Sequence, residues 1–161
     1  MLELYKALHP EDTTVTENDI QIVTLNTVLV NGIYNDLGFL VRGTRLILVE
    51  SQSTWSKNIV YRLFQYVAKT LEEYQESRKE DLYGTKSLKL PVLELYVIYT
   101  GDKPVPDKLF LENLFPGEEK QLQLYAKVIS QAENNVIGEY IRFFHIFDEQ
   151  RKKFGYTTKA I

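Results

Sequence analysis

The sequence predicts one α/β domain with helices on both faces of a central β-sheet. A chain of 161 residues with 44% hydrophobic side chains is sufficient for a single compact core, so residues 1–161 are treated as one domain. Turn signals at Asn31-Gly32 and Gly43-Thr44 separate three apolar segments and predict three consecutive antiparallel strands. A long amphipathic segment and a further apolar strand follow, which is the order of a parallel crossover.

The composition excludes several classes of protein. The chain has no cysteine, which rules out a disulfide framework, a thiolate metal site and a cysteine nucleophile. No segment approaches the ~18 apolar residues of a membrane span and the start does not resemble a signal peptide, so we expect a cytoplasmic protein with no membrane partner. The absence of a glycine-rich phosphate loop argues against a nucleotide cofactor. A net charge of −3 means that any nucleic-acid binding depends on local basic patches.

A short helix is predicted over residues 2–8, where Leu4 and Leu8 are one helical turn apart. The dipeptide His9-Pro10 ends this helix, because proline lacks the backbone N–H that a helix needs. We interpret His9 as a surface or capping group.

The first hairpin is predicted from a strand over residues 18–30 and the turn signal Asn31-Gly32. A two-residue turn at this place aligns Val23 with Leu40 of the next strand. Both faces of the resulting sheet are apolar over most of their length, so helices are expected above and below it.

The second hairpin carries the candidate site. A three-residue loop over 42–44, with Gly43 at positive φ, aligns Asp36 with Glu50. A two-residue loop would instead align Asp36 with Ser51 and turn Glu50 to the opposite face. We favour the first register because it gathers four apolar side chains on the second face: Leu37, Phe39, Ile47 and Val49.

In the favoured register Asp36 and Glu50 share one face with their Cβ atoms about 5 Å apart, and two like charges at that distance repel each other. A pair of this kind usually has a cation between its members. Gln52 lies two residues further along the strand and projects beside the carboxylates. The structural alternative is that both carboxylates are satisfied by backbone or basic groups.

Apolar side chains recur at helical spacing from Ile59 to Leu71 and predict a helix that extends to about Ser77. Three other side chains are expected together, roughly opposite the apolar stripe: Arg62, Tyr66 and Lys69. They form either a solvated face or a contact with phosphate.

Further segments are predicted beyond this helix. A strand over residues 93–100 should run parallel to the strand that precedes the helix. Alternating apolar side chains over 121–130 predict an edge strand, and residues 134–147 predict a final amphipathic helix.

The ordered segments resemble the PD-(D/E)XK nucleases, and more closely the recombination-promoting nuclease and transposase family. The matching blocks are Asn35-Asp36 with Phe39, Val49 to Thr54, Arg62 with Tyr66, Leu82 to Lys86, Leu90-Pro91 and Tyr96 to Gly101. The resemblance implies a restriction-endonuclease-like core of order αβββαβ, with a mixed central sheet flanked by helices. It also implies family helices before residue 1 and after residue 161, so an uncovered sheet face could support a homodimer.

The resemblance implies a metal-dependent DNA endonuclease. Asp36 and Glu50, with the backbone carbonyl of Ser51, would hold Mg²⁺ or Mn²⁺. Gln52 takes the place of the usual lysine as the third catalytic residue and supplies no positive charge. Candidate nucleic-acid-binding residues are Arg62, Tyr66 and Lys69. The alternative function is a catalytically inactive nuclease-like domain that binds nucleic acid or forms oligomers.

Overall fold

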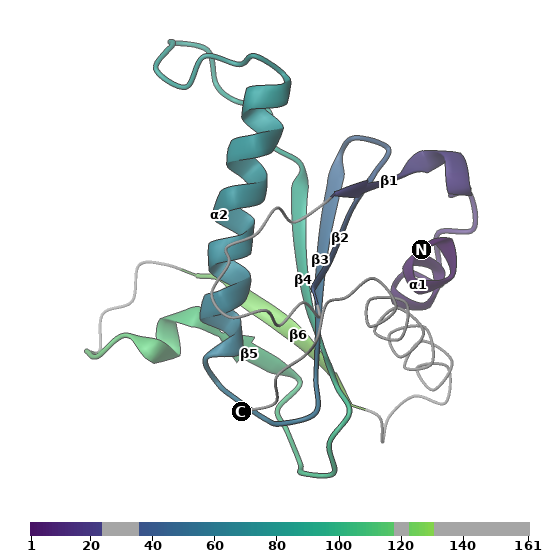
Figure 1. The fold of residues 1–161 in the computed structure, drawn as a ribbon, viewed down its shortest axis with the longest axis vertical. Coiled ribbons are helices and arrows are strands. Elements are labelled where there is room, and N and C mark those ends of the chain that lie inside the picture. Colours follow the sequence, from purple (N-terminus) through teal and green to yellow (C-terminus); the bar gives the residue numbers. More distant parts are fainter. Residues whose placement is uncertain (24–35, 118–122, 131–161) are drawn as a thin grey trace, which may run out of the picture.

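The computed structural model describes residues 1–23, 36–117 and 123–130, and within them a six-stranded mixed sheet has a helix on each face (Figure 1). The helices are α1 (Leu2–Leu8) and α2 (Ile59–Ser77), with short 3-10 helices at Glu17–Asp19 and Leu111–Leu114. The strands are β1 (Ile20–Val23), β2 (Asp36–Val41), β3 (Arg45–Gln52), β4 (Val92–Tyr99), β5 (Lys108–Phe110) and β6 (Tyr125–Ser130). The predicted α/β class is confirmed. No helix in these described ranges is long and apolar enough to cross a membrane.

The sheet has the order β1-β2-β3-β4-β6-β5. Strands β1, β2 and β3 are antiparallel, whereas β4 runs parallel to β3, as predicted for strands joined by a helix. The prediction that residues 121–130 form an edge strand is wrong, because β6 lies between β4 and β5. Strand β5 covers that edge, and its three residues are too few to show a periodic pattern.

The hairpin of β2 and β3 has the predicted register. Its loop contains Arg42 at φ 50° and Gly43 at φ 65°, and the pair Val41 and Arg45 closes it. Positive φ at both of these positions is typical of a type I′ turn, which is closed by the hydrogen bond from the Thr44 amide to the Val41 carbonyl at 3.0 Å. Thr44 is the additional residue between this turn and Arg45, so the loop has three residues. Asp36 is therefore aligned with Glu50, six pairs along the ladder.

The hairpin of β1 and β2 departs from the predicted register by two residues. Val23 is aligned with Gly38 and Gln21 with Leu40, whereas a two-residue turn would have aligned Val23 with Leu40. A shift of two residues keeps every side chain on its face, so the apolar pattern could not distinguish the two registers. The remainder of the predicted strand and its turn, residues 24–35, lies outside the described residues, as does the predicted helix over 134–147.

Two hydrophobic cores lie on opposite faces of the sheet. Helix α2 covers the face that carries Leu46, Leu48, Leu95, Val97 and Val128, and contributes Ile59, Val60, Leu63 and Val67. Helix α1 and Val15 cover the other face, which carries Phe39, Ile47, Val49, Tyr96 and Ile98. Each fully buried aliphatic side chain contributes roughly 1.5–3 kcal/mol relative to an exposed one. The expectation of helices above and below the sheet is confirmed.

Candidate metal and nucleic-acid site

The candidate site is at the end of β3, on the face covered by α2. The carbonyl of Gln52 accepts a hydrogen bond from the Thr100 amide at 3.0 Å, so it faces β4. Backbone groups alternate in direction along a strand, so the backbone of Glu50 also faces β4. In the backbone, Asp36 and Glu50 are therefore a non-hydrogen-bonded antiparallel pair, the type in which Cα atoms approach to about 4.5 Å.

The same alternation places the Ser51 carbonyl. Because the carbonyls of Glu50 and Gln52 face β4, the carbonyl between them faces the opposite side, toward the start of β2 at Asp36. The structure thus directs a backbone oxygen from Ser51 to the side of β3 on which Asp36 begins its strand.

The Glu50 carboxylate is fully buried and forms an ion pair with Arg62 of α2. The side chain of Glu50 is 0% exposed, whereas that of Arg62 is 41% exposed. Arg62 is in the first turn of α2, where its amide donates to the Asn58 carbonyl at 3.2 Å. The guanidinium therefore approaches the sheet from the helix and neutralises a carboxylate that water does not reach.

Gln52 contributes a buried amide beside this pair. Its Nε2 atom has no hydrogen-bond partner among the described residues. Tyr99 is its neighbour on β4, and Trp55 packs edge-on against the Tyr99 ring with centroids 5.6 Å apart. Trp55 is thus a packing anchor of the α2-side core. A Cβ at Gly101 would overlap with the Tyr99 hydroxyl and the Ser53 carbonyl, so glycine permits this close approach.

The three predicted nucleic-acid-binding residues do not form one group. Arg62 and Tyr66 lie on the flank of α2 nearest the sheet, and the prediction that they lie opposite the apolar stripe is wrong. Residues 62, 66 and 70 follow each other at four-residue spacing, and Thr70 is only 4% exposed. The polar residue types in this column do not indicate burial in the sequence, so the position of the column against the sheet is a finding of the structure.

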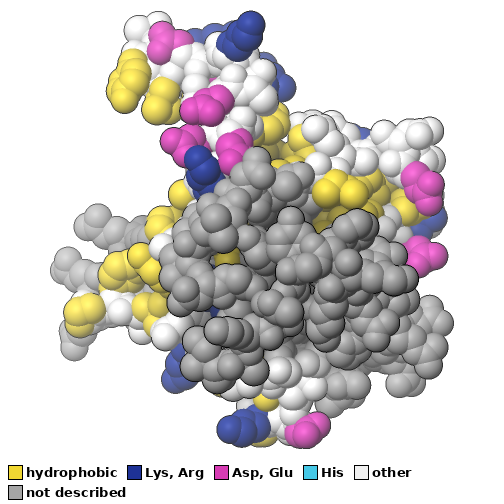
Figure 2. Space-filling model, in the orientation of Figure 1, with side chains coloured by type: hydrophobic (Ala, Val, Ile, Leu, Met, Phe, Trp, Pro, Cys, Tyr) yellow, Lys and Arg dark blue, Asp and Glu magenta, His cyan; other side chains and the backbone are white. Residues whose placement is uncertain are grey.

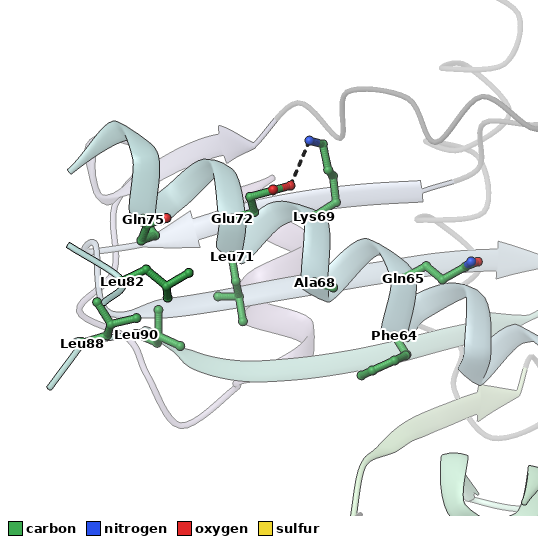
Figure 3. Close-up of a pocket in the computed structure, with 10 residues that line it drawn as sticks. All are labelled: Phe64, Gln65, Ala68, Lys69, Leu71, Glu72, Gln75, Leu82, Leu88 and Leu90. Carbon is green, nitrogen blue, oxygen red and sulfur yellow. Dashed lines mark hydrogen bonds and ion pairs between the residues drawn. The ribbon is translucent and has the colours of Figure 1, made fainter. Parts of the chain in front are cut away.

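Lys69 belongs to a different surface. Its Nζ atom pairs with Glu72 at 3.1 Å, and both residues border an apolar groove of about 640 Å³ (Figure 3). The groove is lined mainly by α2 and by leucines of the segment that follows it: Phe64, Ala68, Leu71, Leu82, Leu88 and Leu90. This segment projects from the molecule and carries hydrophobic, basic and acidic side chains together (Figure 2). The carboxylate Glu50 and its partner Arg62 do not line the groove.

A second polar cluster, missed in the sequence, lies on the α1-covered face, beside the first residue of β3. The carboxylate of Glu94 accepts hydrogen bonds from His9 Nε2 at 2.7 Å, Arg45 Nη1 at 2.7 Å and Tyr96 Oη at 2.8 Å. His9 is the C-cap residue of α1, and its amide donates to the Tyr5 carbonyl at 2.8 Å, so its interpretation as a capping group is confirmed. Its interpretation as a surface group is wrong, because the side chain is only 7% exposed and stacks on Tyr5. Burial, followed by the bond to Glu94, raises the pKa of Tyr96. The available signal was a charged residue inside each of two otherwise apolar strands, Arg45 in β3 and Glu94 in β4.

The donor set at the end of β3 is suited to a hard divalent cation. Glu50 supplies a carboxylate and Ser51 a backbone oxygen. The buried Nε2 atom of Gln52 is a hydrogen-bond donor and not a cation ligand, so only the amide oxygen of Gln52 could join these two groups. Among the described residues no group of three histidine, aspartate, glutamate or cysteine side chains could hold a metal. Magnesium is commonly held by one or two carboxylates together with water and substrate phosphate, so this smaller set is compatible with it.

Fold and site together define a mixed α/β domain with a carboxylate-bearing sheet end under a long helix. No family model matches the chain, and no match was found among curated proteins or among solved structures. The function is therefore argued from the site itself.

Proposed function

We propose that this protein is a metal-dependent DNA endonuclease with a restriction-endonuclease-like core. The observation that carries the proposal is the strand register that aligns Asp36 with Glu50 while Glu50 is fully buried. Two carboxylates aligned across a narrow antiparallel pair repel each other, and a buried carboxylate requires a counter-charge. The order α1-β1-β2-β3-α2-β4 of the described elements is compatible with the αβββαβ core.

The residues divide the chemistry between them. Asp36, Glu50 and the Ser51 carbonyl would hold Mg²⁺ or Mn²⁺, which when bound lowers the pKa of water and stabilises charge on a phosphate. The Gln52 amide would orient the attacking water or donate to a phosphate oxygen. Arg62 reaches the same site from α2 with a permanent positive charge, and a guanidinium binds phosphate oxygens in pairs.

One observation favours the alternative of a catalytically inactive, nucleic-acid-binding domain. Arg62 already neutralises Glu50 without a cation, and Gln52 adds no charge of its own. An ion pair with a purely structural role would show the same contact between Arg62 and Glu50. The two functions differ in one respect, because only the enzyme needs a cation at Glu50 to act on DNA.

Nicking of supercoiled plasmid by the full chain in Mn²⁺ tests the proposal. Asp36→Ala and Glu50→Gln should each abolish nicking. The control Glu72→Gln, which removes an exposed carboxylate on α2, should leave nicking unchanged. Circular dichroism should show that all three variants are folded. If plasmid binding occurs but no protein, wild type included, nicks it in Mn²⁺ or Mg²⁺, the inactive alternative replaces the proposal.

A further inference from the structure

We propose that Arg62 and a divalent cation compete for Glu50, and that binding of the cation releases the Arg62 guanidinium to bind a phosphate. Arg62 would then be a positioning residue with two states, paired with Glu50 before the cation arrives and directed to the substrate afterwards. This inference rests on the proposed function and assigns it an order of binding, with cation before DNA.

The burial of the two partners is unequal, which is the first argument. Glu50 is 0% exposed, and a buried carboxylate left without a counter-charge is strongly destabilising. Arg62 is 41% exposed and so retains access to solvent. In its ionised form Glu50 therefore requires a cationic partner, whereas the partly exposed head of Arg62 can return to solvent.

The anchoring of Arg62 is the second argument. Its backbone is fixed in the first turn of α2 by the hydrogen bond to Asn58, so the helix need not move when the side chain does. Long arginine side chains keep their apolar stem packed while the charged head changes position. The guanidinium cannot lose its proton, so it can make room for a cation only by moving away.

The third argument is electrostatic: the Arg62 guanidinium and a divalent cation should not both bind the Glu50 carboxylate at the same time. A dication bound at Glu50 and the Ser51 carbonyl would lie beside the guanidinium, and like charges at such short range repel each other strongly. The cation therefore displaces Arg62 from the carboxylate and leaves it at the edge of α2, available to phosphate.

Calorimetric titration of Mn²⁺ into the full chain tests the competition without measuring catalysis. Arg62→Met should bind Mn²⁺ at least roughly tenfold more tightly than wild type, a gain of ~1.4 kcal/mol. In chelator the same variant should melt at a lower temperature than wild type, because Glu50 loses its ion pair with residue 62. Arg62→Lys, which retains a charge near Glu50, should stay within about threefold of the wild-type affinity.

The matched control is Arg78→Met, because Arg78 pairs with Glu80 at 2.8 Å at the other end of α2. This variant should bind Mn²⁺ as wild type does, which separates local competition from a change in net charge. If Arg62→Met does not fold, Arg62→Gln replaces it, since glutamine can still donate a hydrogen bond to Glu50. Tighter binding by this neutral variant is again the expected result.

The outcomes separate this inference from the proposed function. If wild type binds Mn²⁺ through Glu50 and the neutral variants at position 62 bind it equally or more weakly, the competition is refuted and the metal site remains. If wild type binds no Mn²⁺, or if Glu50→Gln binds Mn²⁺ with the wild-type affinity, both the proposed metal site and the competition are refuted.

Discussion

The imidazole of His9 and the carboxylate of Glu94 lie 2.7 Å apart, and this contact joins the end of α1 to β4 across 85 positions of the chain. Helix α1 has only seven residues, which is too short to be stable alone in water. It is held on the sheet by Leu4, Tyr5 and this hydrogen bond. The Glu94 cluster therefore attaches the helix that covers one of the two cores.

Removal of the Glu94 carboxylate should destabilise the fold. In Glu94→Ala, His9, Arg45 and Tyr96 lose a shared acceptor, and buried polar groups left without partners cost roughly 1–3 kcal/mol. The control Glu72→Ala breaks an exposed ion pair with Lys69 and should cost less than about 1 kcal/mol. Urea unfolding followed by circular dichroism measures both values. Equal losses in the two variants would contradict a stabilising role for the cluster.

The raised pKa of Tyr96 predicts a loss of stability at alkaline pH. A group whose folded pKa lies above its unfolded value contributes stability at low pH and loses it as pH rises, here from about pH 10, the ordinary tyrosine value. In Tyr96→Phe this one proton is removed, so the alkaline slope of the unfolding free energy should fall by up to about 1.4 kcal/mol per pH unit. Urea unfolding at several pH values up to about pH 11 gives the slopes. Parallel curves for the two proteins would exclude Tyr96 as the responsible group.

The register of the second hairpin could be predicted because the apolar pattern distinguished the two loops that Gly43 permits. The two-residue loop would have placed apolar side chains such as Phe39 and Ile47 on the same faces as the carboxylates, whereas the three-residue loop separates them. The first hairpin lacked this check, since a shift of two residues leaves Val23 and Leu40 on their original faces. Local turn chemistry alone was therefore insufficient there.

The partners of the charged side chains were the least predictable part. Helical spacing predicts Arg62 roughly opposite the apolar stripe of its helix, where charged side chains are usually solvated. Its partner Glu50 is distant in sequence, and the ion pair depends on how α2 is rotated over the sheet. The contacts of His9 and Arg45 with Glu94 likewise depend on tertiary packing, which periodicity does not report.

The alignment of Asp36 with Glu50 makes a prediction that needs no DNA. In chelator the two carboxylates repel each other at a cost of roughly 0.2–1 kcal/mol, so Asp36→Asn should melt at or slightly above the wild-type temperature. In saturating Mn²⁺ the wild type should instead melt at a higher temperature than Asp36→Asn. At one hundred times Kd the wild type gains about 2.7 kcal/mol, and a variant with one carboxylate fewer loses most of that gain.

Thermal melts of wild type and Asp36→Asn, each in chelator and in Mn²⁺, supply the four values that this comparison requires. Glu72→Gln is the control, because it removes one exposed carboxylate that is paired with Lys69 and should show the wild-type gain in Mn²⁺. If the carboxylates are instead structural, Asp36→Asn should lose about 1–3 kcal/mol in both conditions, as expected for a badly paired buried group. An equal loss of stability with and without Mn²⁺ would refute the proposed metal site and therefore the proposed endonuclease activity.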